Sequence, residues 1–140
     1  MNSFLLNKRL KEDTCFICSF SLSEVLLMND SRYPWIILVP RLKGVNEIFQ
    51  LSNSNQHQLT DESSFICEKL KTIFNADKIN TGALGNIVPQ LHLHHIARYK
   101  NDDAWPGPVW GKHPPIRYTD EKKENIIQLL KAEFSGMRQL

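Results

Sequence analysis

The sequence predicts an α+β domain: an antiparallel sheet of about five strands, with a long helix packed on one face and a second helix at the C-terminus. Two short runs rich in apolar and β-branched residues, 24–28 and 35–39, are typical of strands. Residues 90–94 alternate polar and apolar side chains, which indicates a strand with one buried face. Residues 54–74 and 119–134 repeat apolar positions every three or four residues, as amphipathic helices do.

Length and composition favour one globular domain. The chain has 140 residues, which is enough to bury a core. Hydrophobic residues make up 41% and charged residues 23%, and both values are ordinary for a soluble globular protein. We expect a single domain over 1–140, with its core in about 15–110 and a C-terminal loop and helix in 111–140.

Charge and cysteine content limit the classes of partner and compartment. The formal net charge of +2 is too small to argue for nucleic acid or a membrane surface as a partner. No apolar run approaches the roughly 20 residues of a membrane span. Residues 1–9 lack the basic and apolar pattern of a secretory signal. Three cysteines, an odd number, argue against a disulfide scaffold, so we expect a cytoplasmic protein.

The strands are expected to be joined by short connections. Residues 29–34, between the first two strands, have the composition of a hairpin turn. Pro40 should end the second strand because proline cannot donate to a ladder. A further strand is expected over 78–81, and a short helix precedes the sheet within 5–11.

Both long helices carry recognisable ends. Ser54 or Asn55 can cap the first, which should end near Phe74. Thr119 or Asp120 should start the second, which has acidic residues in its first turn. We expect the first helix to lie across the back of the sheet, against the apolar side chains of the 90–94 strand.

The 90–94 strand carries the candidate chemistry. Gln90, His92 and His94 project from one face, and next-but-one side chains on a strand are roughly 6.6 to 7 Å apart. Two imidazoles placed in this way suit nucleophilic or acid–base catalysis. The same spacing also fits a solvated pair or half of a metal site. Pro89 removes a ladder donor, so we expect an edge or a local irregularity there.

A turn-rich loop leads directly into this strand. Gly82 and Gly85 allow positive φ and a close approach of ligand to backbone N–H groups. The amides of Asn80 and Asn86 can hydrogen-bond phosphate oxygens without adding charge. An ordinary Gly/Asn turn is the alternative.

With these residues in place, the chain resembles the histidine triad (HIT) family of nucleotide hydrolases and nucleotidyltransferases, whose signature is His-φ-His-φ-His-φ-φ, where φ is apolar. The resemblance covers about residues 15–110, and its parts occur in the family's order. They are Cys15 and Cys18, Asn29 and Asp30, Pro34, residues 37–41, Asn80, Gly82, Gly85, Asn86, the run from Gln90 to Ile96, and Arg98.

The resemblance implies attack on the α-phosphate of a nucleotide by His92, the middle triad residue, to form a covalent nucleotidyl-histidine. It implies that His94 polarises the phosphate or protonates the leaving group, while Gln90 replaces a supporting histidine. Dinucleoside polyphosphates, nucleoside phosphoramidates and nucleotide sugars are the candidate substrates. The scheme needs no catalytic metal and no cofactor.

The resemblance also implies the binding residues and the assembly. Asn86, with the amides of the loop at Gly85, would hold phosphate oxygens, and Asn80 would support the loop. Asp30 would contact the ribose hydroxyls, or would simply shape its turn. We expect a homodimer, because HIT proteins form twofold dimers whose C-terminal segment completes the neighbouring site.

The sequence departs from the family at Gln90, which cannot act as an acid or base, and at His95, which stands where the family has an apolar residue. Alternation puts His95 on the face of Leu91 and Leu93. Trp105 and Trp110 lie in a proline-rich loop. They would cover the phosphate site, stack on a base or pack at a dimer interface, and we favour the structural or interface role.

Two other functions remain open. The first is a nucleotide-binding regulatory module with little or no turnover, which the substitution at Gln90 motivates. The second is a metalloprotein that uses Cys15, Cys18, His92 and His94. Cys15 and Cys18 lack the histidines that would complete a structural zinc site, so packing near a strand is the favoured role for both. His113 has no partner nearby in the sequence and receives no role.

Overall fold

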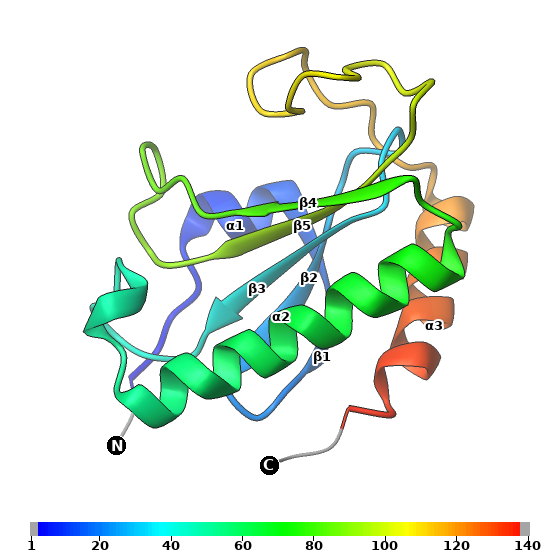
Figure 1. The fold of residues 1–140 in the computed structure, drawn as a ribbon. Helices are drawn as coiled ribbons and strands as arrows, with labels where there is room; N and C mark the ends of the chain where they lie inside the picture. The colour runs from blue at the N-terminus through cyan, green and yellow to red at the C-terminus, as the bar shows by residue number, and fades with distance from the viewer. Residues whose placement is uncertain (1–2, 138–140) are drawn as a thin grey trace.

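A five-stranded antiparallel sheet organises the fold, as the sequence predicts. The computed structural model describes residues 3–137. The strands are β1 (Thr14–Ser19), β2 (Ser23–Met28), β3 (Trp35–Pro40), β4 (Lys78–Gly82) and β5 (Leu93–Arg98), in the order β1-β2-β3-β5-β4 (Figure 1). Neighbouring strands are all antiparallel, and β2 and β3 form the expected hairpin.

The helices also agree with the sequence, with small shifts at their ends. The long helix α2 (Asn53–Ile73) begins after Ser52, whose hydroxyl accepts the N–H of Asn55, rather than after Ser54 or Asn55. Thr119 caps α3 (Asp120–Phe134) in the same way. The first helix, α1, covers Lys8–Asp13, and a 3₁₀ turn, η1, covers Ile48–Gln50. No helix within residues 3–137 is long and apolar enough to cross a membrane.

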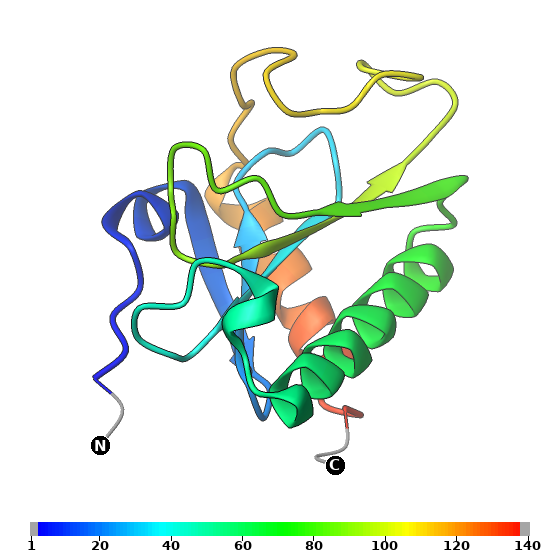
Figure 2. The ribbon, with the colours of Figure 1, turned by 60° about the vertical axis from the view of Figure 1, so that its left-hand side comes forward.

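Apolar side chains form a separate cluster on each face of the sheet. One cluster joins alternate residues of β2 and β3, such as Val25 and Ile36, to α2 and α3. The other joins Ile37 and Ile96 to Leu10 of α1 and to residues after β5. Figures 1 and 2 show α2 lying across the sheet. The long loop after β5, coloured yellow to orange, arches at the top of both views.

The histidine strand begins later than predicted and extends further, to Arg98. β5 begins at Leu93, so Gln90 and His92 lie in irregular backbone just before it. The Leu91 N–H donates to the Val45 carbonyl and not to β3, and Pro89 has no N–H to donate, so the ladder with β3 begins only at Leu93. His94 and Ile96 nevertheless share a face with Trp35 and Ile37 of the neighbouring strand β3.

A buried guanidinium connects β5 to the loop that follows it. The side chain of Arg98 is 1% exposed and donates from Nε and Nη2 to the carboxylate of Asp102, at 2.8 and 3.0 Å. It also donates to Asn80 Oδ1 on β4 (2.7 Å) and to the Gly107 carbonyl (2.8 Å). Its guanidinium lies over the ring of Trp105. These bonds fix the start of the loop against the two strands.

Asp102→Ala should therefore reduce the free energy of unfolding by about 3–5 kcal/mol, because it leaves a buried cation unpaired. The matched control is Asp103→Ala. The Asp103 side chain is 60% exposed and its ion pair with Arg32 is 3.8 Å long, so the loss there should stay below about 1 kcal/mol. Urea unfolding measures both values, and equal losses would contradict the assignment.

Candidate active site

His92 is held in one tautomer by the main chain. Its Nδ1 lies 2.7 Å from the carbonyl oxygen of Gln90. A carbonyl can only accept, so Nδ1 carries the proton and Nε2 keeps its lone pair. The side chain is buried but lines a cavity. His92 is therefore oriented as a nucleophile or a base through Nε2.

His94 is held in the complementary tautomer. The indole Nε1–H of Trp35 donates to His94 Nδ1 at 2.9 Å, so the proton of the neutral ring lies on Nε2. Burial, followed by the neighbouring His92 and His95, lowers the pKa of His94 to about 3. The ring centroids of His92 and His94 are 4.9 Å apart. When both rings are neutral, the pair thus offers a lone pair from His92 and an uncharged N–H donor from His94.

His95 faces the opposite side of the sheet and has a structural explanation. Its Nδ1 donates to the Ile36 carbonyl (3.2 Å), and its Nε2 accepts from the hydroxyl of Ser63 on α2 (2.8 Å). Burial lowers its pKa to about 4, so the ring is neutral at physiological pH. The unusual histidine therefore joins α2 to β3 and β5, and both of its ring nitrogens bond groups outside the His92–His94 pair.

The loop before the histidines contributes part of the predicted binding set. Gly85, with φ +77°, and Asn86 line a cavity of about 280 Å³ together with His92 and His94. Asn80 does not belong to this group, because its side-chain oxygen accepts from Arg98. The structure thus brings Gly85 and Asn86 to the histidines and turns Asn80 toward the buried guanidinium.

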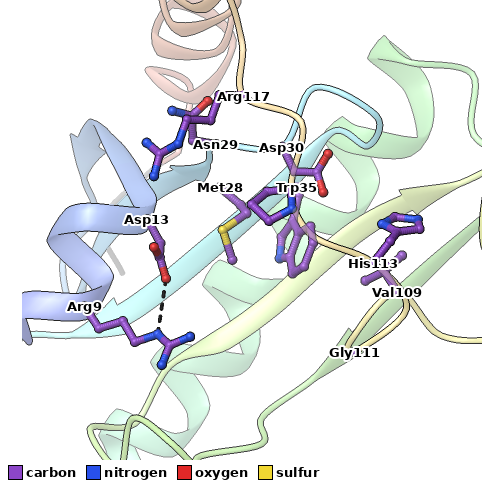
Figure 3. A pocket seen from close by; sticks show the side chains of 11 residues that line it. Arg9, Asp13, Met28, Asn29, Asp30, Trp35, Val109, Gly111, His113 and Arg117 are labelled. Carbon is purple, nitrogen blue, oxygen red and sulfur yellow. Dashed lines mark ion pairs between the residues drawn. The ribbon is translucent and has the colours of Figure 1, made fainter.

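A second cavity of about 300 Å³ adjoins the first and shares Arg9, Asp13 and Met28 with it (Figure 3). Trp35 forms part of its apolar lining. Asp30 lies at its edge and is 3% exposed, with its carboxylate paired to Arg32 at 3.1 Å.

Asp30 also accepts the N–H of Arg32. The carboxylate therefore shapes its turn, which is one of the two roles that the sequence left open, and it does so at the wall of a cavity.

The side chain of Gln90 hydrogen-bonds the N-terminal segment of the chain. Its Oε1 accepts the N–H of Asn7 and its Nε2 donates to the Leu5 carbonyl, both at 2.9 Å. Its contribution to His92 comes from the main-chain carbonyl. Gln90 thus holds the N-terminal segment with its side chain and orients His92 with its main chain.

The two cysteines near the N-terminus lie away from the histidines. Cys15 and Cys18 pack against the apolar cluster on the α2 and α3 face, and burial raises the pKa of Cys18 to about 11. Among residues 3–137, no three His, Cys, Asp or Glu side chains form a group suited to a metal ion. The donor set for the metalloprotein alternative is therefore not assembled.

Three residues at the site were not found from the sequence. Trp35 was predicted only as a strand residue, although its place on the face of β3 shared with His94 could have indicated it. Arg9 reaches both cavities from α1, and His113 lines the second cavity and bonds the hydroxyl of Tyr33 at 3.1 Å. Neither Arg9 nor His113 carries a local sequence signal.

Trp110 packs edge-on against His94.

A family model and the similar solved structures all point to the same family. The model of the HIT domain matches residues 9–101. A histidine triad protein from Marinobacter aquaeolei VT8 is 49% identical, with a TM-score of 0.94 over 96% of this chain and 98% of that one. One from Sinorhizobium meliloti 1021 is 41% identical, with a TM-score of 0.91 over 95% and 98% of the two chains.

A third histidine triad protein, from Bradyrhizobium japonicum, is 45% identical, with a TM-score of 0.90 over 93% of this chain and 97% of that one. No match was found among curated proteins.

Trp35→Phe should release the tautomer of His94, because it removes the N–H that donates to Nδ1. Nitrogen NMR of the histidines should show a pure Nε2–H form of His94 in the wild type and a mixture in the variant. The control is Trp110→Phe, since Trp110 also touches His94 but its Nε1 has no hydrogen-bond partner among the described residues. An unchanged His94 tautomer in Trp35→Phe would contradict the assignment.

Stability should fall as the pH drops from about 6.5 to about 4, since His95 stays neutral in the fold while the unfolded chain takes up a proton. The expected slope is about 1.4 kcal/mol per pH unit for each such histidine. His95→Val should reduce the slope, leaving the part due to His94. Urea unfolding at several pH values measures it, and an equal slope in both proteins would refute the role of His95.

Proposed function

Because the chain belongs to the histidine triad family, we propose that it cleaves or transfers nucleoside phosphates by reaction at the α-phosphate through His92. One observation carries this proposal: the Gln90 carbonyl holds the Nδ1 proton of His92, which leaves Nε2 as a nucleophile at the wall of a cavity. Family membership alone implies nucleotide chemistry, and the tautomer of His92 supplies the reacting atom.

In the proposed first step, Nε2 of His92 forms a bond to the α-phosphorus, and the bond from phosphorus to the leaving group breaks. The electron pair departs with that group. The ring then carries a positive charge, which the Gln90 carbonyl stabilises at Nδ1–H. In the second step water attacks the same phosphorus and the bond from phosphorus to Nε2 breaks, with its electron pair returning to the ring. The water gives up one proton to the solvent, and the nucleoside monophosphate leaves with Nε2 free again. Transfer follows if another acceptor replaces water.

His94 serves as a neutral donor in this scheme. Its Nε2–H is directed by the bond from Trp35 to Nδ1, and its low pKa argues for polarising the phosphate over carrying a positive charge. A fixed donor stabilises the charge that develops on phosphate oxygens without reorganising. Asn86 and the backbone at Gly85, which line the same cavity, would provide further donors.

The second cavity accommodates the nucleoside in this proposal. Met28, Trp35 and Val109 give it an apolar surface suited to a base. Asp30 lies at the same wall, where it would meet the ribose if its pairing with Arg32 relaxed, and Asn80 acts indirectly through Arg98.

Dinucleoside polyphosphates and nucleoside phosphoramidates are the proposed substrates, and the protein is proposed to act in the cytoplasm as a homodimer. Analytical ultracentrifugation would measure whether the protein is a monomer or a dimer in solution. β4 ends the sheet and pairs only with β5 among the described strands, so it leaves one edge for a second chain.

The test of function is a product assay with a dinucleoside polyphosphate and an adenosine phosphoramidate. Wild type should release AMP, and His92→Ala should reduce the rate by at least about 1000-fold, the scale for loss of a nucleophile. His57→Ala, on the exposed face of α2, controls for losing a histidine and should have no effect. Mass spectrometry of quenched wild type should show one nucleotidyl group, absent from His92→Ala.

A different outcome would favour the binding module. If wild type binds AMP and releases no product from either substrate, the enzymatic proposal is wrong and the chain is a nucleotide-binding relative. The occupation of Gln90 by the N-terminal segment, where the family has a histidine, is the feature that would then require explanation.

A further inference from the structure

The N-terminal segment is fastened by a pair of hydrogen bonds to one side chain. Gln90 accepts from the N–H of Asn7 and donates to the carbonyl of Leu5, so both ends of its amide are used. The bonded residues are 83 and 85 positions away in sequence. An amide that donates and accepts can pair with an extended backbone as a neighbouring strand does, and neither a leucine nor a carboxylate can do both.

The fastened segment leads directly into a wall of the site. The side chain of Asn7 caps α1 by accepting the N–H of Arg9 at 2.8 Å. Arg9 and Asp13 of this helix, which pair at 3.5 Å, line both cavities, and Leu10 packs into the apolar cluster on the same face. The position of Arg9 therefore depends on where residues 5–7 are held.

We propose that Gln90 is a positioning residue that sets the place of α1, and so of Arg9, for binding of the nucleotide. The inference rests on the proposed function, since it concerns the same cavities. It assigns the amide at the first triad position a task that differs from proton chemistry. Arg9 is the cation that faces the shared wall of the two cavities, where an anionic substrate would pass.

The chain offers a matched pair of variants that isolates one bond. Asn7 has φ −55°, which proline adopts without strain. Asn7→Ala and Asn7→Pro both remove the cap of α1, but only Asn7→Pro removes the N–H that Gln90 accepts. Gln90→Leu removes both bonds from the other side, and Gln128→Leu, an exposed residue on α3, controls for the exchange itself.

Three readouts test the proposal: hydrogen exchange at the Asn7 amide, the Kd for AMP by calorimetry, and KM with kcat for a cleaved substrate. Gln90→Leu should abolish the protection of Asn7 and raise the Kd about 3- to 10-fold, the scale for one or two neutral hydrogen bonds. KM should rise with it, while kcat stays within about twofold because the Gln90 carbonyl still orients His92.

Coupling separates positioning from general destabilisation. Asn7→Pro should weaken AMP binding more than Asn7→Ala does, and this difference should vanish in the Gln90→Leu background, where the Asn7 N–H has lost its acceptor. Arg9→Ala should likewise add little to Gln90→Leu. Additive losses, or an unchanged Kd in Gln90→Leu, would overturn the proposal.

The readouts also distinguish failure of the positioning role of Gln90 from failure of the proposed nucleotide-cleaving function. Active wild type with normal KM and Kd in Gln90→Leu would overturn the positioning role and leave the function intact. Wild type that neither binds nor cleaves nucleotides would overturn both the function and the binding role, whatever the exchange data show at Asn7.

Discussion

The buried guanidinium of Arg98 is the contact on which the architecture of the site most depends. From β5 it meets a side-chain amide on β4, and a carboxylate and a backbone carbonyl in the loop after β5, so these three segments cannot move independently. Because that loop brings Trp110 against His94, the packing of a histidine of the candidate site depends on an ion pair outside the cavity. A buried charge is expensive to leave unpaired, and this cost favours the single arrangement in which all its partners are present.

Three neighbouring positions show how the same side chain takes different tasks. His92 and His94 each have one ring nitrogen fixed, by a carbonyl and by an indole N–H, whereas His95 has both fixed, by a carbonyl and a hydroxyl. Strand alternation separates His95 from His94, and the irregular backbone before Leu93 brings His92 close to His94. Chemistry is therefore assigned by the partner and the face, and the residue type alone does not assign it.

Local patterns predicted most of the fold. Apolar runs, alternation and helical periodicity indicated β2, β3, β4, β5, α2 and α3, because these patterns record which face of each element is buried. β1 was included only in the expected total of about five strands and was not located by any such pattern. Ser52 was missed as a cap in favour of Ser54 or Asn55, since several residues there have suitable side chains. The start of β5 was placed too early because alternation continues through Gln90 although the ladder does not.

The site was predicted less completely, for a physical reason. His92, His94, Gly85 and Asn86 lie near one another in sequence, and the structure groups them. Arg9, Trp35 and His113 come from other elements, so only the packed sheet brings them to the cavities. The side chains of Asn80 and Gln90 are used by Arg98 and by the N-terminal segment, and these are long-range pairings that no local pattern records.

The groups that orient the two site imidazoles, a main-chain carbonyl and an indole N–H, carry no charge. In serine protease triads a carboxylate has this task, and there the substrate is an uncharged amide. A substrate phosphate already brings negative charge, and an anion behind the attacking ring would repel it at short range. In the proposed reaction, uncharged orienting groups would keep His92 aligned without that repulsion, so the same geometry would admit a polyanion.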